Sequence, residues 1–125
     1  MIVDNDQVNS FVLKNIINRN YSGAKISSFP DGAEAIDELT RLELGEEDFP
    51  AVILLDIYMP VMDGFEFLTE YMKRFSHKQT IIFAMSNSLI KEDQQRANDY
   101  DVVKGFITKP LIYNNIEFII ETYIQ

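Results

Sequence analysis

The sequence contains no cysteine and no tryptophan, and its single histidine is His77. Without cysteine, neither a disulfide framework nor a thiolate metal site can form. One histidine also excludes a His-rich metal cluster. No apolar run approaches the roughly 20 residues of a membrane-spanning helix, and the first residues lack the pattern of a signal peptide. We therefore expect a cytoplasmic protein with no membrane contact.

Basic residues are also few, since 11 Lys and Arg stand against 20 Asp and Glu and give a net charge of −9. This charge repels a phosphate backbone, so we expect no direct binding to nucleic acid. It suits a protein that holds a divalent cation or docks on a basic surface, although solubility alone also explains it. The 125 residues, 46% of them hydrophobic, are enough for one domain with its own core.

Two kinds of apolar segment alternate along the chain. Short continuous runs are typical of strands covered on both faces, whereas the other segments repeat their apolar residues every three or four positions, as helices do. Strict alternation of the two predicts an α/β fold with a parallel sheet and helices on both faces. The expected strands cover residues 2–3, 24–29, 51–55, 80–85 and 102–108. The expected helices cover residues 7–20 (with a stripe of Val8, Phe11, Val12, Ile16 and Ile17), 33–44, 63–75, 88–100 and 111–123.

Polar side chains follow these expected strands at positions that a buried strand would avoid. In open parallel sheets, ligands bind outside the C-terminal ends of the strands, where the strand order reverses. Transfer of a phosphoryl group to a carboxylate needs a fixed nucleophile, a cation on the phosphoryl oxygens and a positive side chain nearby. The residues at these ends are Asp4, Asn5, Asp6, Asp56, Ser86 and Lys109.

These residue types fit that chemistry. Asp56 is the candidate nucleophile, and Lys109 is the candidate cation for the phosphate. Ser86 offers a hydroxyl donor. Asp4 and Asp6, with Asp56, are candidate oxygen ligands for Mg²⁺, which commonly takes one or two carboxylates plus waters. Each residue alone also fits a turn, capping or surface role, and the functional interpretation depends on their combination at four strand ends.

Three segments resemble the receiver domain of two-component response regulators, and the resemblance extends over nearly the whole chain. The segments are Ile-Leu-Leu-Asp-Ile-Tyr-Met-Pro-Val-Met-Asp-Gly at 53–64, Ile-Phe-Ala-Met-Ser at 82–86 and Phe-Ile-Thr-Lys-Pro at 106–110. The resemblance implies a doubly wound, flavodoxin-like (βα)5 sheet with strand order 2-1-3-4-5. It also implies one receiver domain over residues 1–125, with no output domain in this chain.

The resemblance implies roles for individual residues. Asp56 is then the phosphoacceptor, Lys109 its phosphate partner, and the main-chain carbonyl of Tyr58 a metal ligand. Ser86 and Phe106 form the switch that responds to the phosphate, with Phe106 in place of the Tyr that family members often have. Phe106 equally fits a plain sheet residue that a helix partly covers. The family also implies a cis peptide bond between Lys109 and Pro110.

Partners follow from the same resemblance. The phosphoryl group comes from a sensor histidine kinase or a phosphotransfer protein, and a downstream protein reads the face from Ser88 to Tyr123. A homodimer is also open. The domain is then a signalling module in a phosphorelay and not an enzyme, apart from its part in its own aspartyl phosphorylation and dephosphorylation.

One position departs from the family pattern. Receivers usually carry two adjacent acids after the first strand, and the second of these positions, the main metal ligand, holds Asn5 here. Asp6 falls one residue later, where its side chain can point elsewhere. We therefore predict that Mg²⁺ binds more weakly than in a typical member.

Three alternatives remain beside this interpretation. Asn5 also fits a pseudo-receiver that docks partners with impaired phosphorylation. The Asp-x-Asp spacing of Asp4 and Asp6 occurs in haloacid-dehalogenase-like phosphatases, where the first Asp attacks phosphate, but 125 residues are few for that class. A flavin-binding module of the same topology needs a hydroxyl- and Gly-rich phosphate loop, which residues 7–10 do not resemble.

Overall fold

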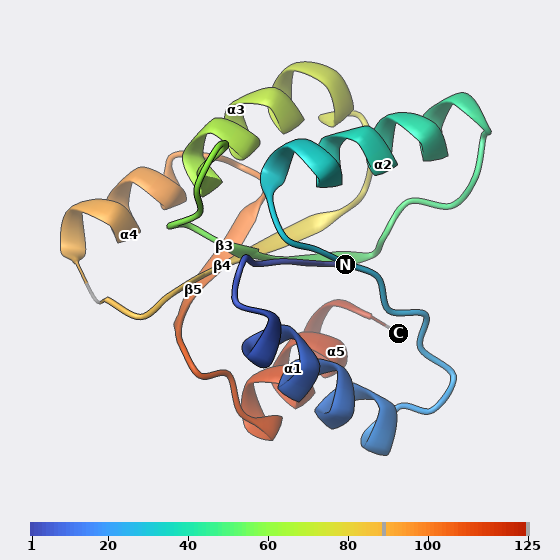
Figure 1. Ribbon diagram of the computed structural model, residues 1–125, viewed down its shortest axis with the longest axis vertical. Helices are drawn as coiled ribbons and strands as arrows, with labels where there is room; N and C mark the ends of the chain where they lie inside the picture. Colours follow the sequence, from blue (N-terminus) through green and yellow to red (C-terminus); the bar gives the residue numbers. More distant parts are fainter. Residues whose placement is uncertain (89, 125) are drawn as a thin grey trace.

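The structure is a computed structural model that describes residues 1–88 and 90–124. Leu89, which falls in the predicted fourth helix, and Gln125, the end of the predicted domain, lie outside the described residues. One parallel sheet has the strand order β2-β1-β3-β4-β5 (Figure 1), which confirms the predicted fold class and order. The strands are β1 (Ile2–Val3), β2 (Ser28–Phe29), β3 (Val52–Asp56), β4 (Ile81–Ser86) and β5 (Val103–Thr108).

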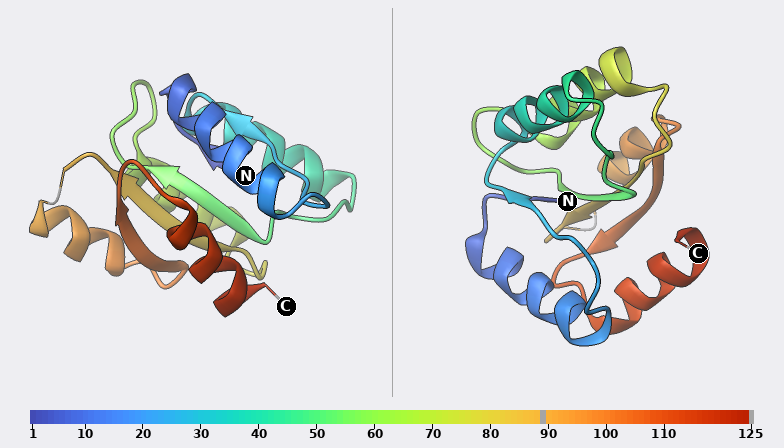
Figure 2. Two further views of the ribbon diagram at one scale, coloured as in Figure 1. Left: turned by 90° about the horizontal axis from the view of Figure 1, so that it is seen from below. Right: turned by 90° about the vertical axis from the view of Figure 1, so that its right-hand side faces the viewer.

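Helices cover both faces of this sheet, as Figures 1 and 2 show. Helices α2, α3 and α4 pack on one face over a core that includes Phe67, Tyr71 and Phe75. Helices α1 and α5 pack on the other face over a smaller core that includes Leu13 and Ile116. The helices are α1 (Gln7–Asn20), α2 (Gly32–Leu44), α3 (Gly64–Phe75), α4 (Lys91–Asn98) and α5 (Tyr113–Tyr123). Among the described residues, no helix is long and apolar enough to cross a membrane.

Aspartates start three of the helices. Asp6, Asp31 and Asp63 each stand at an N-cap in extended backbone and accept hydrogen bonds from main-chain N–H groups of the first turn. Asp63 and Glu66 form a reciprocal capping box. Helices α4 and α5 are different, because Ile90 and Ile112 at their N-caps offer no side-chain acceptor. These two helices therefore depend more on contacts with other elements.

The predicted strand at 24–29 is wrong in length. Only Ser28 and Phe29 form β2, in register with Ile2 and Val3 of β1. Ile2 donates its N–H to Ser27 O at 2.8 Å, and the pairing does not extend to residues 24–26. A strand needs a partner for its main-chain groups. The two-residue β1 therefore limits β2 more than the apolar pattern of 24–29 suggests.

The apolar stripe expected on α1 is partly wrong. Val8, Phe11 and Val12 are 72%, 66% and 43% exposed. Ile16 and Ile17 do pack against the core, beside the fully buried Leu13. Side chains at three- and four-residue spacing share a helix face, but the sequence does not say which face meets the sheet.

Two later helices are shorter than the sequence predicts. Helix α4 spans Lys91–Asn98 and not 88–100. Ser88 is held outside it because its N–H binds Ser86 Oγ at 3.1 Å. Helix α5 begins at Tyr113 and not at 111, since Ile112 is still extended and donates its N–H to Asn115 Oδ1 at 2.9 Å.

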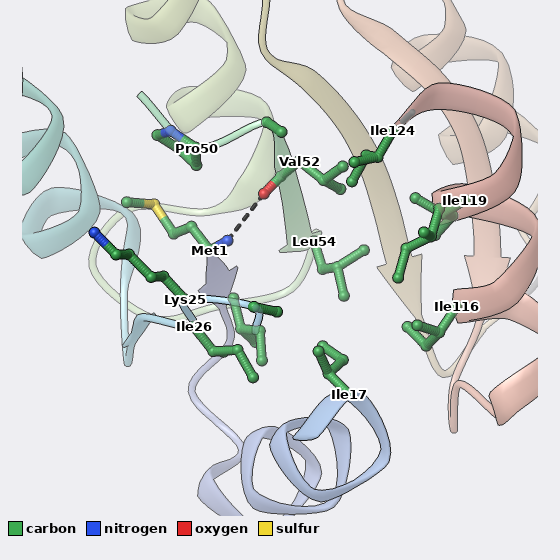
Figure 3. Close-up of a pocket in the computed structure, with 14 residues that line it drawn as sticks. Met1, Ile17, Lys25, Ile26, Pro50, Val52, Leu54, Ile116, Ile119 and Ile124 are labelled. Atoms are coloured by element: carbon green, nitrogen blue, oxygen red, sulfur yellow. Dashed lines mark hydrogen bonds between the residues drawn. The ribbon is translucent and has the colours of Figure 1, made fainter. Parts of the chain in front are cut away.

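A cavity of about 250 Å³ lies between the sheet and helices α1 and α5, on the side away from the C-terminal strand ends. Figure 3 shows the aliphatic side chains of Ile17, Leu54, Ile116 and Ile119 around it. Val52 of β3 also lines it, and its carbonyl oxygen accepts a hydrogen bond from the Met1 amino group at 2.9 Å. Side chains that face this pocket lack part of the dispersion contacts of a packed core, so this region can accept additional side-chain volume.

We expect Val52→Ile to stabilise the protein by about 0.5–1 kcal/mol, the value of one buried methylene. The substitution keeps a β-branched residue on the strand and adds its methylene at the cavity wall. Urea unfolding followed by far-UV circular dichroism measures the change. Val103→Ile is the matched control, because Val103 packs in the core on the opposite face of the sheet. Extra volume there should give no gain, and an equal gain from both changes would contradict the prediction.

Candidate functional site

The site lies where the C-terminal ends of β1 and β3 meet. Val3 pairs with Leu55 across these neighbouring strands, so Asp4 and Asp56 follow at adjacent positions. The chain leaves β1 toward one face of the sheet to form α1, and leaves β3 toward the other face to form α3 (Figure 1). Such a reversal point is where ligands bind in open α/β sheets.

Two buried carboxylates share one ammonium at this point. Asp4 is 0% exposed and Asp56 is 4% exposed. Lys109 Nζ lies 2.9 Å from Asp4 Oδ2 and 3.3 Å from Asp56 Oδ2. With one positive and two negative charges, the buried group keeps a net charge of −1 and retains an attraction for a further cation.

The pKa values reflect this shortage of positive charge. Burial raises the pKa of Asp56 to about 6, and the nearby charge of Asp4 adds to the rise, while Lys109 opposes it. Burial lowers the pKa of Lys109, but its hydrogen bonds and charge interactions with Asp4 and Asp56 outweigh this and raise it overall. Lys109 is therefore positively charged at neutral pH. Ionisation of Asp56, in contrast, costs free energy in the folded protein.

Main-chain bonds hold Lys109 and Ser86 together at the ends of β4 and β5. Lys109 donates its N–H to Ser86 O at 2.8 Å. The peptide bond from Lys109 to Pro110 is cis, the isomer that the resemblance implies. Ser86 is fully buried, and its Oγ accepts the N–H of Ser88. The Ser86 hydroxyl hydrogen thus remains available for another acceptor.

A close turn after β3 fixes the direction of Asp56. Ile57 donates its N–H to Met85 O at 3.1 Å, and Gly64 donates its N–H to Ile57 O at 2.8 Å. A Cβ at Gly64 would lie 2.7 Å from Ile57 Cα and 2.8 Å from Asp56 O. Only glycine allows this approach, which explains why glycine follows the Asp63 cap.

Tyr58 joins the site to α4. Its N–H is 3.3 Å from Asp56 Oδ1, and its hydroxyl donates to Asp93 Oδ2 of α4. The Tyr58 side chain is otherwise half exposed. Because α4 has no side-chain cap at its start, this bond is one of the contacts that hold its first turn.

We expect Tyr58→Phe to speed amide hydrogen exchange in α4 several-fold without a matching change in α3. The variant keeps the aromatic ring and removes only the hydroxyl that binds Asp93. Tyr113→Phe is the matched control, because it removes a tyrosine bond to Glu117 that lies within α5. Equal protection of α4 in the Tyr58 variant and the wild type would contradict the prediction.

The remaining predicted residues lie in different settings. Asn5 is exposed. Asp6 Oδ1 accepts the N–H groups of Val8 and Asn9, so Asp6 serves as the cap of α1. Phe106 on β5 is half buried and packs against the larger core. Within the described chain, no cluster of three or more acidic, His or Cys side chains could hold a metal.

Sequence reasoning did not identify two contacts of the site. Asn9 donates from Nδ2 to Asp4 Oδ2 at 2.7 Å, and Asp93 accepts the hydroxyl of Tyr58. Asn9 is the third residue of α1, and a polar residue there, shortly after Asp4, is a weak signal that can be read from the sequence. The Asp93 contact spans 35 positions, and no local pattern indicates it.

Comparisons with known proteins identify the family of this chain. A family described as the response regulator receiver domain matches residues 1–121. Hybrid signal transduction histidine kinase L of Dictyostelium discoideum is 32% identical over 126 residues, which cover 98% of this chain but 7% of that protein. The chain thus spans a small part of this relative.

Solved structures show the same fold. A two-component response regulator from Cytophaga hutchinsonii has a TM-score of 0.89 and 27% identity, with 98% of this chain and 93% of that chain covered. The phosphorylated cyanobacterial phytochrome response regulator RcpA has a TM-score of 0.83 and 23% identity, with 99% and 91% covered. With its sheet order and the family match over residues 1–121, the chain belongs to the receiver-domain family of two-component response regulators.

Proposed function

We propose that Asp56 is a phosphoacceptor and that the chain acts as the receiving module of a phosphorelay. The observation that carries this is the buried Asp56 carboxylate, 3.3 Å from an ammonium that it shares with a second buried acid. Receiver domains interact with histidine kinases and phosphotransfer proteins, and a protein of one of these two kinds is the donor. The structural neighbour RcpA is itself a phosphorylated regulator.

Each residue of the site has its own role in the transfer of the phosphoryl group. An Asp56 carboxylate oxygen attacks phosphorus as the bond to the donor's leaving group breaks. Lys109 neutralises charge on the phosphoryl oxygens, since its ammonium already lies at the carboxylate. Asp4 keeps Lys109 in place through its own 2.9 Å contact. The fixed backbone around Gly64 limits the directions in which Asp56 can move.

The oxygen donors here fit Mg²⁺. Two buried carboxylates and the main-chain carbonyl of Tyr58 match its preference for a few carboxylates plus waters. Mg²⁺ supplies neutralisation of charge on the transferred group. Asn5 is neutral and exposed, and Asp6 already caps α1, so the site holds one carboxylate fewer than two adjacent acids would give. Affinity for Mg²⁺ is accordingly weaker than in receivers with both acids.

Phosphate at Asp56 would act on the switch residues Ser86 and Phe106. It adds about −2 charge and three acceptor oxygens. The Ser86 hydroxyl, on the adjacent strand end, turns to donate to the phosphate, and Phe106 follows inward behind it. The result is a shifted population of the face from Ser88 to Tyr123, which a downstream protein reads.

Mapping of the labelled residue tests this function against its rivals. After incubation with acetyl phosphate and Mg²⁺, we expect the acyl phosphate on Asp56. Label on Asp4 would instead support a haloacid-dehalogenase-like phosphatase, although its carboxylate already accepts three hydrogen-bond donors. No label on any residue would support the pseudo-receiver, for which the neutral Asn5 is the favouring observation.

A further inference from the structure

The Asp4 carboxylate is surrounded by hydrogen-bond donors. Its Oδ1 accepts the N–H of Asp6 at 2.9 Å. Its Oδ2 accepts both the side-chain amide of Asn9 at 2.7 Å and the ammonium of Lys109 at 2.9 Å. A carboxylate oxygen has about two lone-pair sites. Both sites of Asp4 Oδ2 are therefore filled by the protein's own side chains.

The position of Asn9 is set by the start of α1. Asp6 caps the helix, and its Oδ1 accepts the main-chain N–H of Asn9 at 3.1 Å. Asn9 is partly exposed, so its amide stands at the boundary between the buried acid and solvent. The cap thus fixes the backbone of Asn9, while its partly exposed side chain borders on solvent.

Any cation that coordinates Asp4 Oδ2 has to displace one of these two donors. Lys109 is held on both sides, because it also contacts Asp56 and its N–H is bound to Ser86 O. Asn9 makes one side-chain contact here, is neutral and lies nearer to solvent. A neutral amide bond to a carboxylate is also weaker than a charge-assisted one. Asn9 is thus the donor that can leave more readily.

We propose that Asn9 is a further residue of this site: its side-chain amide competes with a divalent cation for the lone pair of Asp4 Oδ2, and the cation binds when Asn9 releases Asp4. Asn9 then lowers cation affinity in addition to the neutral Asn5. The inference concerns the cation pocket of the proposed phosphoacceptor site, but it requires no phosphoryl transfer. Mg²⁺ binding alone can therefore test it, whatever happens at Asp56.

The test is a Mg²⁺ titration of the protein without any phosphodonor, followed by ¹⁵N–¹H nuclear magnetic resonance. The side-chain amide signals of Asn9, assigned by their loss in Asn9→Ala, should shift with the same midpoint as the main-chain signals of the strand ends. The side-chain amide of Asn15, exposed on the same helix, should not move. Asn9 signals that stay unchanged while Mg²⁺ saturates the site would overturn the proposal.

Two substitutions separate this proposal from a purely structural role of Asn9, in which its removal would weaken the site. Asn9→Ala should raise the affinity for Mg²⁺ a few-fold, because it frees the lone pair. Asn9→Asp should raise it about tenfold or more, since it also adds a charge beside the cation. Asn15→Asp adds the same charge to an exposed position of α1 and should change affinity less than about twofold. Weaker binding in Asn9→Ala, or equal effects of the two Asp variants, would overturn the proposal.

Discussion

Asp56→Asn is expected to be more stable than the wild type at pH 7, by about 2 kcal/mol, although it removes the proposed reactive group. Burial and the charge of Asp4 raise the pKa of Asp56 to about 6 in the folded protein. The unfolded value is about 3.9, and each unit of difference corresponds to about 1.4 kcal/mol. The pKa of about 6 already includes the favourable charge contact with Lys109, so this difference is the net cost of ionising Asp56.

The sign of the pH dependence follows from the raised pKa. Between about pH 4 and pH 6 the folded protein binds more protons at Asp56 than the unfolded chain does, so stability falls as pH rises through this window. Above about pH 6, the free-energy cost of ionising the buried Asp56 is fully present and no longer changes with pH. The advantage of Asp56→Asn should therefore be full at pH 7 and largely absent at pH 4.

Urea unfolding at both pH values measures this difference. Asp37→Asn serves as the control, because Asp37 is an exposed acid on α2. That variant should match the wild type within about 0.5 kcal/mol at either pH. A destabilised Asp56→Asn at pH 7, or a gain that persists unchanged at pH 4, would show that burial of the charge is not what raises the pKa.

Lys109→Met is expected to destabilise the protein at pH 7 by about 3–5 kcal/mol, the usual result of leaving a buried charge without its partner. Lys109 Nζ contacts both Asp4 and Asp56, so its loss leaves two buried carboxylates close together. Methionine keeps much of the length of the side chain, which limits the cavity. The same variant should also be much slower to accept a phosphoryl group, because the transferred oxygens lose their nearest ammonium.

A double-mutant cycle isolates the cause. Adding Asp56→Asn to Lys109→Met removes one of the two unpaired charges, so the combined loss of stability should be clearly smaller than that of Lys109→Met alone. Lys104→Met is the matched control, because Lys104 lies exposed on the same strand and its ammonium binds the main-chain carbonyl of Asp101. Comparable losses in the two lysine variants would contradict the assigned role of Lys109.

The sequence predicts the sheet well because alternation of apolar runs and helical stripes is a local pattern. It also places Asp4, Asp56 and Lys109 at strand ends, and parallel strands bring such ends to one edge. The pattern fails where structure depends on a distant partner. Residues 24–26 extend beyond the pairing with β1, and Val8 is exposed because α1 turns another face to the sheet.

Prediction of the site also succeeds for local features and fails for contacts that depend on tertiary structure. Its place after the first strand makes Asp6 a candidate ligand, but its Oδ1 accepts the N–H groups that start α1. Asn9 was not identified, because its contact with Asp4 depends on how the helix turns after the cap. The attachment of α4 through Tyr58 and Asp93 depends on tertiary packing alone. Local chemistry could thus be predicted from sequence, whereas competition between neighbouring groups for the same oxygen could not.

Intact mass spectrometry after incubation with acetyl phosphate and Mg²⁺ tests the central claim most directly. The wild type should gain the mass of one phosphoryl group, and Asp56→Asn should gain none. Because this variant is expected to be stable, the absence of a gain would not be due to unfolding. No gain in the wild type at saturating Mg²⁺, or an equal gain in Asp56→Asn, would contradict the assignment of Asp56 as the phosphoacceptor.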